Sequence, residues 1–238
     1  MSFLRWNVVQ SIGLSMKSKC GCDPGHSAVG NPEGFPIEYL PAMASAARWA
    51  AIRPGGPMAK RFFARHPTVL QVGSTLFVHG GLLPDHVQYG VNKINKESQM
   101  WMLGNSQIRN IPRVLAGKNA VVWTREYSWE EPKDCNCEKL KAVLDAVPGA
   151  DRMVVGHTIQ DAGINSACNG MVYRIDVGMS KGCGDHDVQV LEILEDKEIR
   201  RLGWDANGKP KVIGHEDAWT LNTFFGAVRS AVGSAKPA

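Results

Sequence analysis

Residues 75–81 (TLFVHGG) decide how this chain folds, because residues 152–158 (RMVVGHT) repeat their pattern later in the sequence. Each stretch is a short apolar run that ends at a histidine beside glycine. A continuous apolar run of this length is typical of a strand buried on both faces. We therefore expect two strands that place the side chains of His79 and His157 at the rim of a sheet.

The two histidines are candidate metal ligands, because neutral imidazoles in matching positions suit a first-row metal ion. The alternative is that each histidine is a hydrogen-bonded structural residue at a strand end, and the sequence leaves both interpretations open. Glycine leaves room for tight turns and for the close approach of a ligand. The residues expected to support the site in its loops are Gly80, Gly81, Gly156 and Thr158.

Five motifs fall in an order that resembles a known family. Residues 79–84 (HGGLLP), 121–125 (VVWTR) and 156–165 (GHTIQDAGIN) resemble elements of the calcineurin-like metallophosphatases. Residues 53–57 (RPGGP) and 174–183 (RIDVGMSKGC) narrow the resemblance to the Shewanella-like protein phosphatases, which are bacterial-type members found in plants and algae.

This resemblance implies an α/β fold, namely part of the metallophosphatase β-sandwich flanked by helices, with the site at one rim. It also implies a metal-dependent phosphatase of phosphoserine or phosphothreonine proteins, or alternatively of phosphotyrosine, in which two divalent ions (Mn, Fe or Zn) activate water for in-line attack. His79 and His157 would bind the same one of these ions, and the planar guanidinium of Arg125 would bind the phosphate. The alternative for Arg125 is an ordinary surface ion pair, for example with Glu126.

Three motifs with which the family begins its metal site, GDxHG, GDxxDRG and GNHE, do not occur in this sequence. In the family they supply the carboxylate, histidine and asparagine ligands that the two ions require. The resemblance therefore implies that this chain is the C-terminal part of the phosphatase domain, with the N-terminal metal-binding half missing. We expect at most one partial metal site, and low or no activity from the chain alone.

The cysteines offer a second kind of chemistry. Cys135 and Cys137 have Cys-x-Cys spacing, which differs from the wider spacing usual in structural zinc sites. Reduced thiols are the ordinary state in the cytosol, and the sharper alternative is that Cys135 and Cys137 form a redox pair. The full set is Cys20, Cys22, Cys135, Cys137, Cys168 and Cys183.

Composition is that of a globular chain. Of 238 residues, 44% are hydrophobic and 21% are charged, which suits a packed core. The net charge of +4 is spread along the chain without a basic patch interleaved with aromatics, so we do not expect a nucleic-acid partner. We expect no membrane span and a cytoplasmic location, with an organelle as the alternative; the sequence does not predict the oligomeric state.

The chain divides into three expected parts: an irregular Gly/Pro/Cys-rich segment at 1–40, the C-terminal portion of a phosphoesterase domain at 41–195, and an extension at 196–238. Hydrophobic periodicity and turn residues predict the elements within them. The expected helices are 42–66 with a break at 53–57, 87–102, 137–147 and 220–232. The expected strands are 69–72 and 75–79 in a hairpin, 121–124, 153–155, 171–177 and 188–194, with a turn at 205–208.

Three functions remain open on this reasoning. The first is a metal-dependent phosphoprotein phosphatase of which this chain is one part. The second is a non-catalytic remnant that binds phosphate or a protein partner through Arg125. The third is a thiol-based redox or zinc-binding module built on the paired cysteines.

Overall fold

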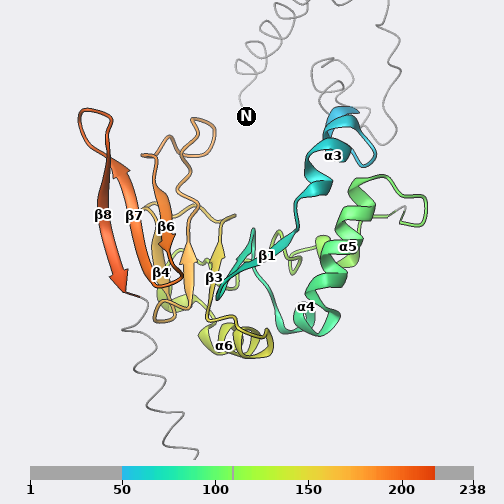
Figure 1. Cartoon of the computed structure of the whole chain (residues 1–238), viewed down its shortest axis with the longest axis horizontal. Helices are drawn as coiled ribbons and strands as arrows, with labels where there is room; N and C mark the ends of the chain where they lie inside the picture. The colour runs from blue at the N-terminus through green and yellow to red at the C-terminus, as the bar shows by residue number, and fades with distance from the viewer. Residues whose placement is uncertain (1–49, 109, 218–238) are drawn as a thin grey trace, which may run out of the picture. The chain divides into compact units, whose positions relative to one another are not determined.

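The computed structural model describes residues 50–108 and 110–217, and it divides them into two compact units (Figure 1). The larger unit comprises residues 68–96 and 112–217, and the smaller comprises residues 50–67 and 97–111. The irregular segment expected at 1–40 and the helix expected at 220–232 lie outside the described residues.

The larger unit is built from two sheets and a few helices. Its strands are β1 (Val69–Val72), β2 (Thr75–Val78), β3 (Arg152–Val155), β4 (Asn165–Ala167), β5 (Val172–Arg174), β6 (Val190–Leu194), β7 (Glu198–Trp204) and β8 (Pro210–Asp217). Its helices are α4 (Pro84–Tyr89), the start of α5 (Val91–Met102), α6 (Cys137–Ala146) and the short 3-10 helices η4 (Arg113–Leu115) and η5 (Pro132–Asp134).

A five-stranded mixed sheet forms the centre of this unit, in the order β1-β2-β3-β5-β4. Strands β2, β3 and β5 are parallel, and the antiparallel strands β1 and β4 form the two edges. The predicted hairpin is confirmed, since Val72 pairs with Thr75 across the turn at Gly73 and Ser74. Gly73 has a φ of 56°, a left-handed conformation that glycine adopts without a steric penalty.

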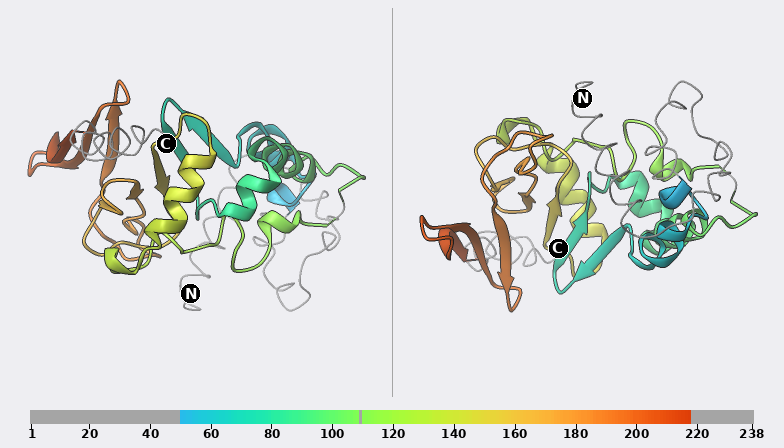
Figure 2. Two further views of the ribbon diagram at one scale, coloured as in Figure 1. Left: turned by 90° about the horizontal axis from the view of Figure 1, so that it is seen from below. Right: turned by 90° about the horizontal axis from the view of Figure 1, so that it is seen from above.

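The central sheet is covered on both faces. Alternate side chains of its buried strands, such as Leu76 and Met153, pack with Leu140 and Val143 of α6. The intervening side chains, such as Val154, face the other way and pack with Ile199 of β7. The second sheet, in the order β6-β7-β8, therefore lies against the opposite face from α6 (Figure 2). The expected α/β class is confirmed at this level.

One ion pair connects the two sheets. Arg152 of β3 is buried, and its Nη1 donates to Oδ1 of Asp196, in the turn between β6 and β7, at 2.8 Å. The other carboxylate oxygen of Asp196 accepts from the backbone N–H of Ser74 at 2.7 Å. The starts of β2 and β3 are thus joined to the tip of the β6–β7 hairpin.

Some expected elements differ from the structure. The helix expected at 87–102 is divided at Gly90, whose φ of 101° ends α4 before α5 begins. The strand expected at 121–124 is wrong, because these residues form a turn in which Trp123 N–H and Thr124 N–H both donate to the Ala120 carbonyl. Strand β4 lies between two expected strands, where no strand was expected. Residues 196–217 form β7 and β8 around the predicted turn at 205–208.

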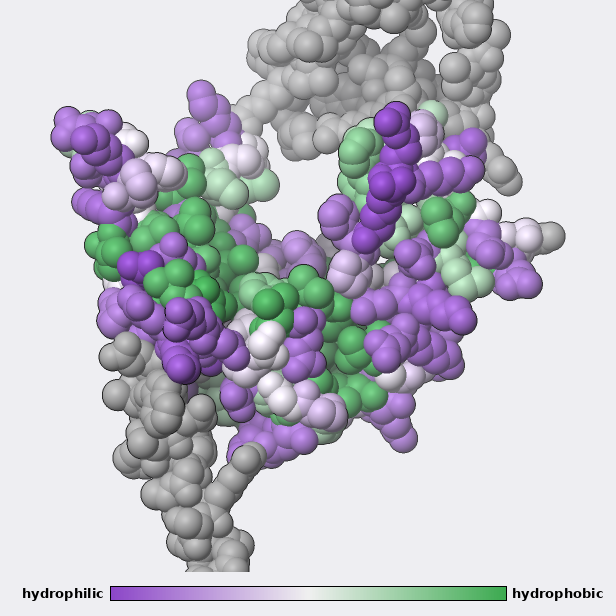
Figure 3. All heavy atoms as spheres, viewed as in Figure 1, coloured by the Kyte–Doolittle hydropathy of each residue, from purple (hydrophilic) through white to green (hydrophobic). Residues whose placement is uncertain are grey.

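The second sheet carries exposed hydrophobic side chains, which Figure 3 shows over β6, β7 and β8. Val190, Trp204 and Val212 are each about half exposed. No helix within the described ranges combines the length and the hydrophobicity needed to cross a membrane.

The smaller unit contains α3 (Pro57–Arg61), the 3-10 helix η3 (Phe63–Arg65) and the end of α5. Pro57 lies in the first turn of α3, where a missing backbone N–H costs nothing. Gly55 N–H donates to the Met102 carbonyl at 2.9 Å, and Gln99 Nε2 donates to the Ala64 carbonyl at 2.9 Å. These bonds attach the turn and helix of residues 50–67 to the end of α5.

Candidate metal and phosphate site

The two predicted histidines lie side by side. His79 directly follows β2, and His157 follows β3 after one glycine. Since β2 and β3 are adjacent parallel strands, their carboxyl ends meet at the same edge of the sheet. The Gly156 N–H donates to the His79 carbonyl at 2.8 Å, and the two imidazole centroids are 5.0 Å apart.

Glycine at position 80 lets a third segment approach this edge. The N–H groups of Gly80 and Gly81 both donate to the Val121 carbonyl, at 2.9 and 3.1 Å. A Cβ at position 80 would lie 2.8 Å from the backbone nitrogen of Trp123, closer than side-chain carbons approach such atoms. Glycine is therefore required at position 80 because the turn at 121–124 packs directly against its backbone.

This turn places an indole and a guanidinium beside the histidines. The Trp123 ring lies 4.8 Å from the His157 ring, centroid to centroid. Arg125 Cζ lies 5.3 Å from the centroid of the Trp123 ring, in the range of a cation–π contact. Within the described part of the chain, no carboxylate forms an ion pair with Arg125. Glu126, the expected alternative partner, pairs with Lys139 instead.

His157 is held in a form that suits a metal ligand. Its φ of 67° is left-handed, which is uncommon outside glycine. Burial, and then the nearby Arg125 and His79, lower the pKa of His157, against the opposing effects of Asp176 and the Trp123 backbone. Its Nε2 is buried and has no hydrogen-bond partner among the described residues. A neutral imidazole with an unused ring nitrogen is what a metal ion requires.

Two residues that the sequence analysis did not assign hold the loop after His157. Gln160 Nε2 donates to the carbonyls of Thr158 and Ser128, at 3.0 and 3.2 Å. The Thr158 and Ser128 hydroxyl oxygens are 2.8 Å apart and share a hydrogen bond. The sequence could have indicated Gln160, because it lies in the motif at 156–165. Ser128 lies outside every motif, so nothing in the sequence indicated its role.

The donor set fits part of a metal site. His79 and His157 could bind one ion together, and imidazole nitrogens suit Mn, Fe or Zn. Residues 50–108 and 110–217 contain no group of three or more His, Cys, Asp or Glu side chains placed to hold an ion. The expected second ion therefore has no ligand set in this part of the chain.

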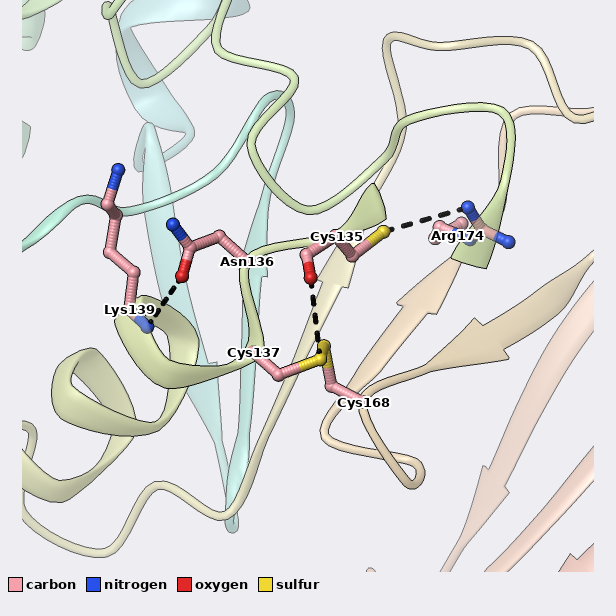
Figure 4. The surroundings of a disulfide bond; sticks show 6 residues. All are labelled: Cys135, Asn136, Cys137, Lys139, Cys168 and Arg174. Atoms are coloured by element: carbon pink, nitrogen blue, oxygen red, sulfur yellow. Dashed lines mark hydrogen bonds between the residues drawn. A yellow bond between two sulfur atoms is a disulfide. The ribbon is translucent and has the colours of Figure 1, made fainter. Parts of the chain in front are cut away.

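The cysteine pairing differs from the expected redox pair (Figure 4). Cys137, at the start of α6, forms a disulfide with Cys168, directly after β4, so pairing of Cys135 with Cys137 is wrong. Cys135 is a buried free thiol whose Sγ lies 3.8 Å from Nη1 of Arg174. Burial raises the pKa of the Cys135 thiol, although Arg174 opposes this, and a protonated thiol is a poor nucleophile.

Comparisons with known proteins point to one group of relatives. The chain is 45% identical over 201 residues to Shewanella-like protein phosphatase 2 of Arabidopsis thaliana, a match that covers 83% of this chain and 51% of the relative. It is 30% identical over 135 residues to Shewanella-like protein phosphatase 1 of Plasmodium berghei, covering 54% of this chain and 36% of the relative.

An uncharacterized protein of Acanthamoeba polyphaga mimivirus is 28% identical over 189 residues, which cover 66% of this chain and 75% of that protein. No protein-family model and no solved structure matches the chain. The chain spans about half, or less, of the length of the two named phosphatases.

Proposed function

Because this chain belongs to the Shewanella-like protein phosphatases, we propose that it serves in the metal-dependent hydrolysis of phosphoproteins. The names of the relatives support phosphatase activity and phosphoprotein substrates. Metal dependence and the division of roles among residues are inferred from the site.

One observation carries the proposal: the imidazoles of His79 and His157 lie 5.0 Å apart at the ends of adjacent parallel strands. Two rings at this separation can direct nitrogens toward a common ion between them. Both backbones are fixed, since the strands pair in register and the Gly156 N–H bonds to the His79 carbonyl. We assign these two histidines to one metal ion.

Arg125 is assigned to the phosphoryl group. Its guanidinium is half-buried, lies on the same side of the turn as the Trp123 ring, and has no carboxylate partner in the described ranges. A guanidinium donates two parallel hydrogen bonds to phosphate oxygens, which both neutralises charge and fixes orientation. A divalent ion bound at the histidines would polarise a phosphoryl oxygen and lower the pKa of a bound water.

A second candidate function is favoured by the incomplete ligand set. The described residues contain no group of three or more His, Cys, Asp or Glu side chains placed to hold an ion. On this second proposal the chain by itself binds a phosphorylated group without hydrolysing it. The third function open from the sequence, a thiol or zinc module, has less support because Cys137 is bonded to Cys168 and Cys135 is buried.

The test is ligand binding by the 238-residue chain, measured before any activity assay. Co²⁺ binding by calorimetry should weaken at least tenfold in His79→Ala and in His157→Ala, because each removes one of two ligands. Inorganic phosphate binding, followed by ³¹P NMR, should weaken about tenfold in Arg125→Ala, which removes a charge-assisted contact. The matched control is His66→Ala, an exposed histidine of the smaller unit. Unchanged Co²⁺ affinity in both site variants would refute the assignment.

A further inference from the structure

We infer that Trp123 is a positioning residue, whose indole holds the His157 imidazole and the Arg125 guanidinium in a fixed relation so that one phosphate can contact both the metal and the arginine. This inference rests on the proposed function, because it gives Trp123 a role between His157, which would bind the metal, and Arg125, which would bind the phosphate.

The indole contacts both groups at once. Its centroid is 4.8 Å from that of the His157 ring, with the two planes tilted by 50°. The guanidinium carbon of Arg125 is 5.3 Å from the same indole. Tilted aromatic pairs and cations over an indole are both attractive arrangements, so the ring restricts the motion of both neighbours.

Core packing does not explain this tryptophan. Trp123 is 52% exposed and does not belong to either buried cluster of the larger unit, whereas its neighbours Val121 and Val122 pack into one of them. A large aromatic side chain left half in water at a sheet rim loses much of its possible hydrophobic stabilisation. What it contacts instead are the two side chains that the proposed chemistry needs.

The backbone at this position is held without the ring. Trp123 N–H donates to the Ala120 carbonyl at 2.9 Å, and the Val121 carbonyl accepts from Gly80 and Gly81. Removing the indole should therefore leave the turn in place and change only the freedom of the His157 and Arg125 side chains.

Because one ring holds both the His157 and the Arg125 side chains, metal binding and phosphate binding should be coupled. A metal that orders His157 also orders Trp123 and, through it, Arg125, so phosphate should bind more tightly when the metal is present. By linkage, phosphate must then tighten metal binding by the same factor. Loss of the ring should reduce this reciprocal effect to the part that direct contact between metal and phosphate supplies.

The test compares Trp123→Ala and Trp123→Phe with Trp204→Ala in the 238-residue chain. Trp204 is the matched control because it is 49% exposed but lies on β7 in the second sheet. Calorimetry gives the Co²⁺ affinity, and ³¹P NMR gives the inorganic phosphate affinity with and without Co²⁺. For Trp123→Ala we expect phosphate affinity to fall about two- to fivefold, the value of one exposed cation–π contact. Co²⁺ should strengthen phosphate binding less in Trp123→Ala than in the wild type, because only the direct contact between metal and phosphate remains.

Trp123→Phe keeps an aromatic ring, and it should restore most of both affinities, which a simple loss of stability would not predict. If Trp123→Ala has a melting temperature well below that of Trp204→Ala, Trp123→Leu replaces it in the comparison with Trp123→Phe. Trp123→Phe, which keeps an aromatic ring, should then bind both ligands more tightly than Trp123→Leu. The inference is overturned if Trp123→Ala binds both ligands as Trp204→Ala does while His157→Ala and Arg125→Ala lose theirs. If His157→Ala and Arg125→Ala also bind normally, the proposed function itself has failed.

Discussion

The candidate site requires glycine at position 80, because a Cβ atom there would collide with neighbouring backbone. A Cβ there would lie 2.8 Å from the Trp123 nitrogen and 3.0 Å from two Thr124 backbone atoms, and backbone atoms cannot move aside as a flexible side chain can. We predict that Gly80→Ala lowers the free energy of unfolding by about 1–3 kcal/mol, the usual cost of overpacking, and weakens Co²⁺ and phosphate binding together. Urea denaturation and the two binding assays measure this.

The control for Gly80→Ala is Gly182→Ala. A Cβ at Gly182 would meet only the Ser180 hydroxyl oxygen at 3.8 Å, and its φ is not left-handed. The control should unfold within about 0.5 kcal/mol of the wild type. Equal stabilities for the two variants would mean that the turn at 121–124 does not pack on the end of β2 as described.

At the residue scale, the sequence could predict which histidines meet but not what surrounds them. His79 and His157 each end an apolar run, and parallel strands bring such ends together, so their proximity follows from pattern alone. The contacts of Trp123 and Ser128 depend on how a turn of no regular periodicity packs against those strands. Nothing in the local sequence encodes that packing.

At the scale of elements, the Asp196 carboxylate joins the tip of the β6–β7 hairpin to the central sheet. Burial alone would raise the pKa of Asp196, but hydrogen bonds from Ser74 and the charge and hydrogen bonds of Arg152 outweigh it and hold that pKa below its ordinary value of 3.8. The Asp196 carboxylate therefore stabilises the fold at pH values above 3.8. This contribution is lost as the pH falls through the lowered pKa.

We predict that Asp196→Asn lowers the free energy of unfolding at pH 7 by about 2–3 kcal/mol, because it leaves the buried Arg152 without a counter-charge. The value is set below the 3–5 kcal/mol of a fully buried pair because Asp196 is partly exposed. The difference from wild type should shrink as the pH falls below 3.8. Denaturation curves from pH 3 to 7 measure it, with the exposed Asp187→Asn as the control; a difference independent of pH would contradict the ion pair.

The disulfide between Cys137 and Cys168 joins the start of α6 to the residue directly after β4, across a sequence separation of 31 residues. Closing a loop of that length restricts the unfolded chain, which predicts that Cys137→Ser with Cys168→Ser costs about 3–4 kcal/mol. Dithiothreitol should lower the stability of the wild type by a similar amount and leave the double variant unchanged. The control, Cys183→Ser, removes an exposed free thiol. A wild type insensitive to dithiothreitol would refute the bond.

An element could be predicted from the sequence where its turn residues and hydrophobic periodicity are local. The hairpin of β1 and β2 and helix α6, with the Asn136 side chain accepting from the Lys139 N–H at its start, were predictable because turn residues and periodicity are local. Strands β7 and β8 were missed because charged side chains such as Arg200 interrupt their alternation. Arg200 is paired with Glu192 across the sheet, a contact that only the fold reveals.

At the scale of the whole molecule, the two imidazoles are too few for the two-ion hydrolysis that we propose. Hydrolysis with two ions requires hard oxygen ligands as well as imidazoles, and the described residues contain no group of three or more His, Cys, Asp or Glu side chains placed to hold an ion. The matched region is 51% of the Arabidopsis relative, so that relative has further residues that this chain does not match. The complete activity is therefore expected to need such residues.

We predict that the 238-residue chain alone hydrolyses p-nitrophenyl phosphate with Mn²⁺ no faster than a His157→Ala variant does. Joining it to the segments of the Arabidopsis relative outside the matched region should produce Mn²⁺-dependent hydrolysis, since carboxylate ligands could then complete a two-ion site around His79 and His157. In that joined protein, Arg125→Ala should reduce kcat/KM at least a hundredfold, because a charge clamp on the transferring phosphoryl group is lost. Hydrolysis by the chain alone that disappears in His79→Ala and His157→Ala would contradict this prediction, because it would mean that the chain already holds every ligand it needs.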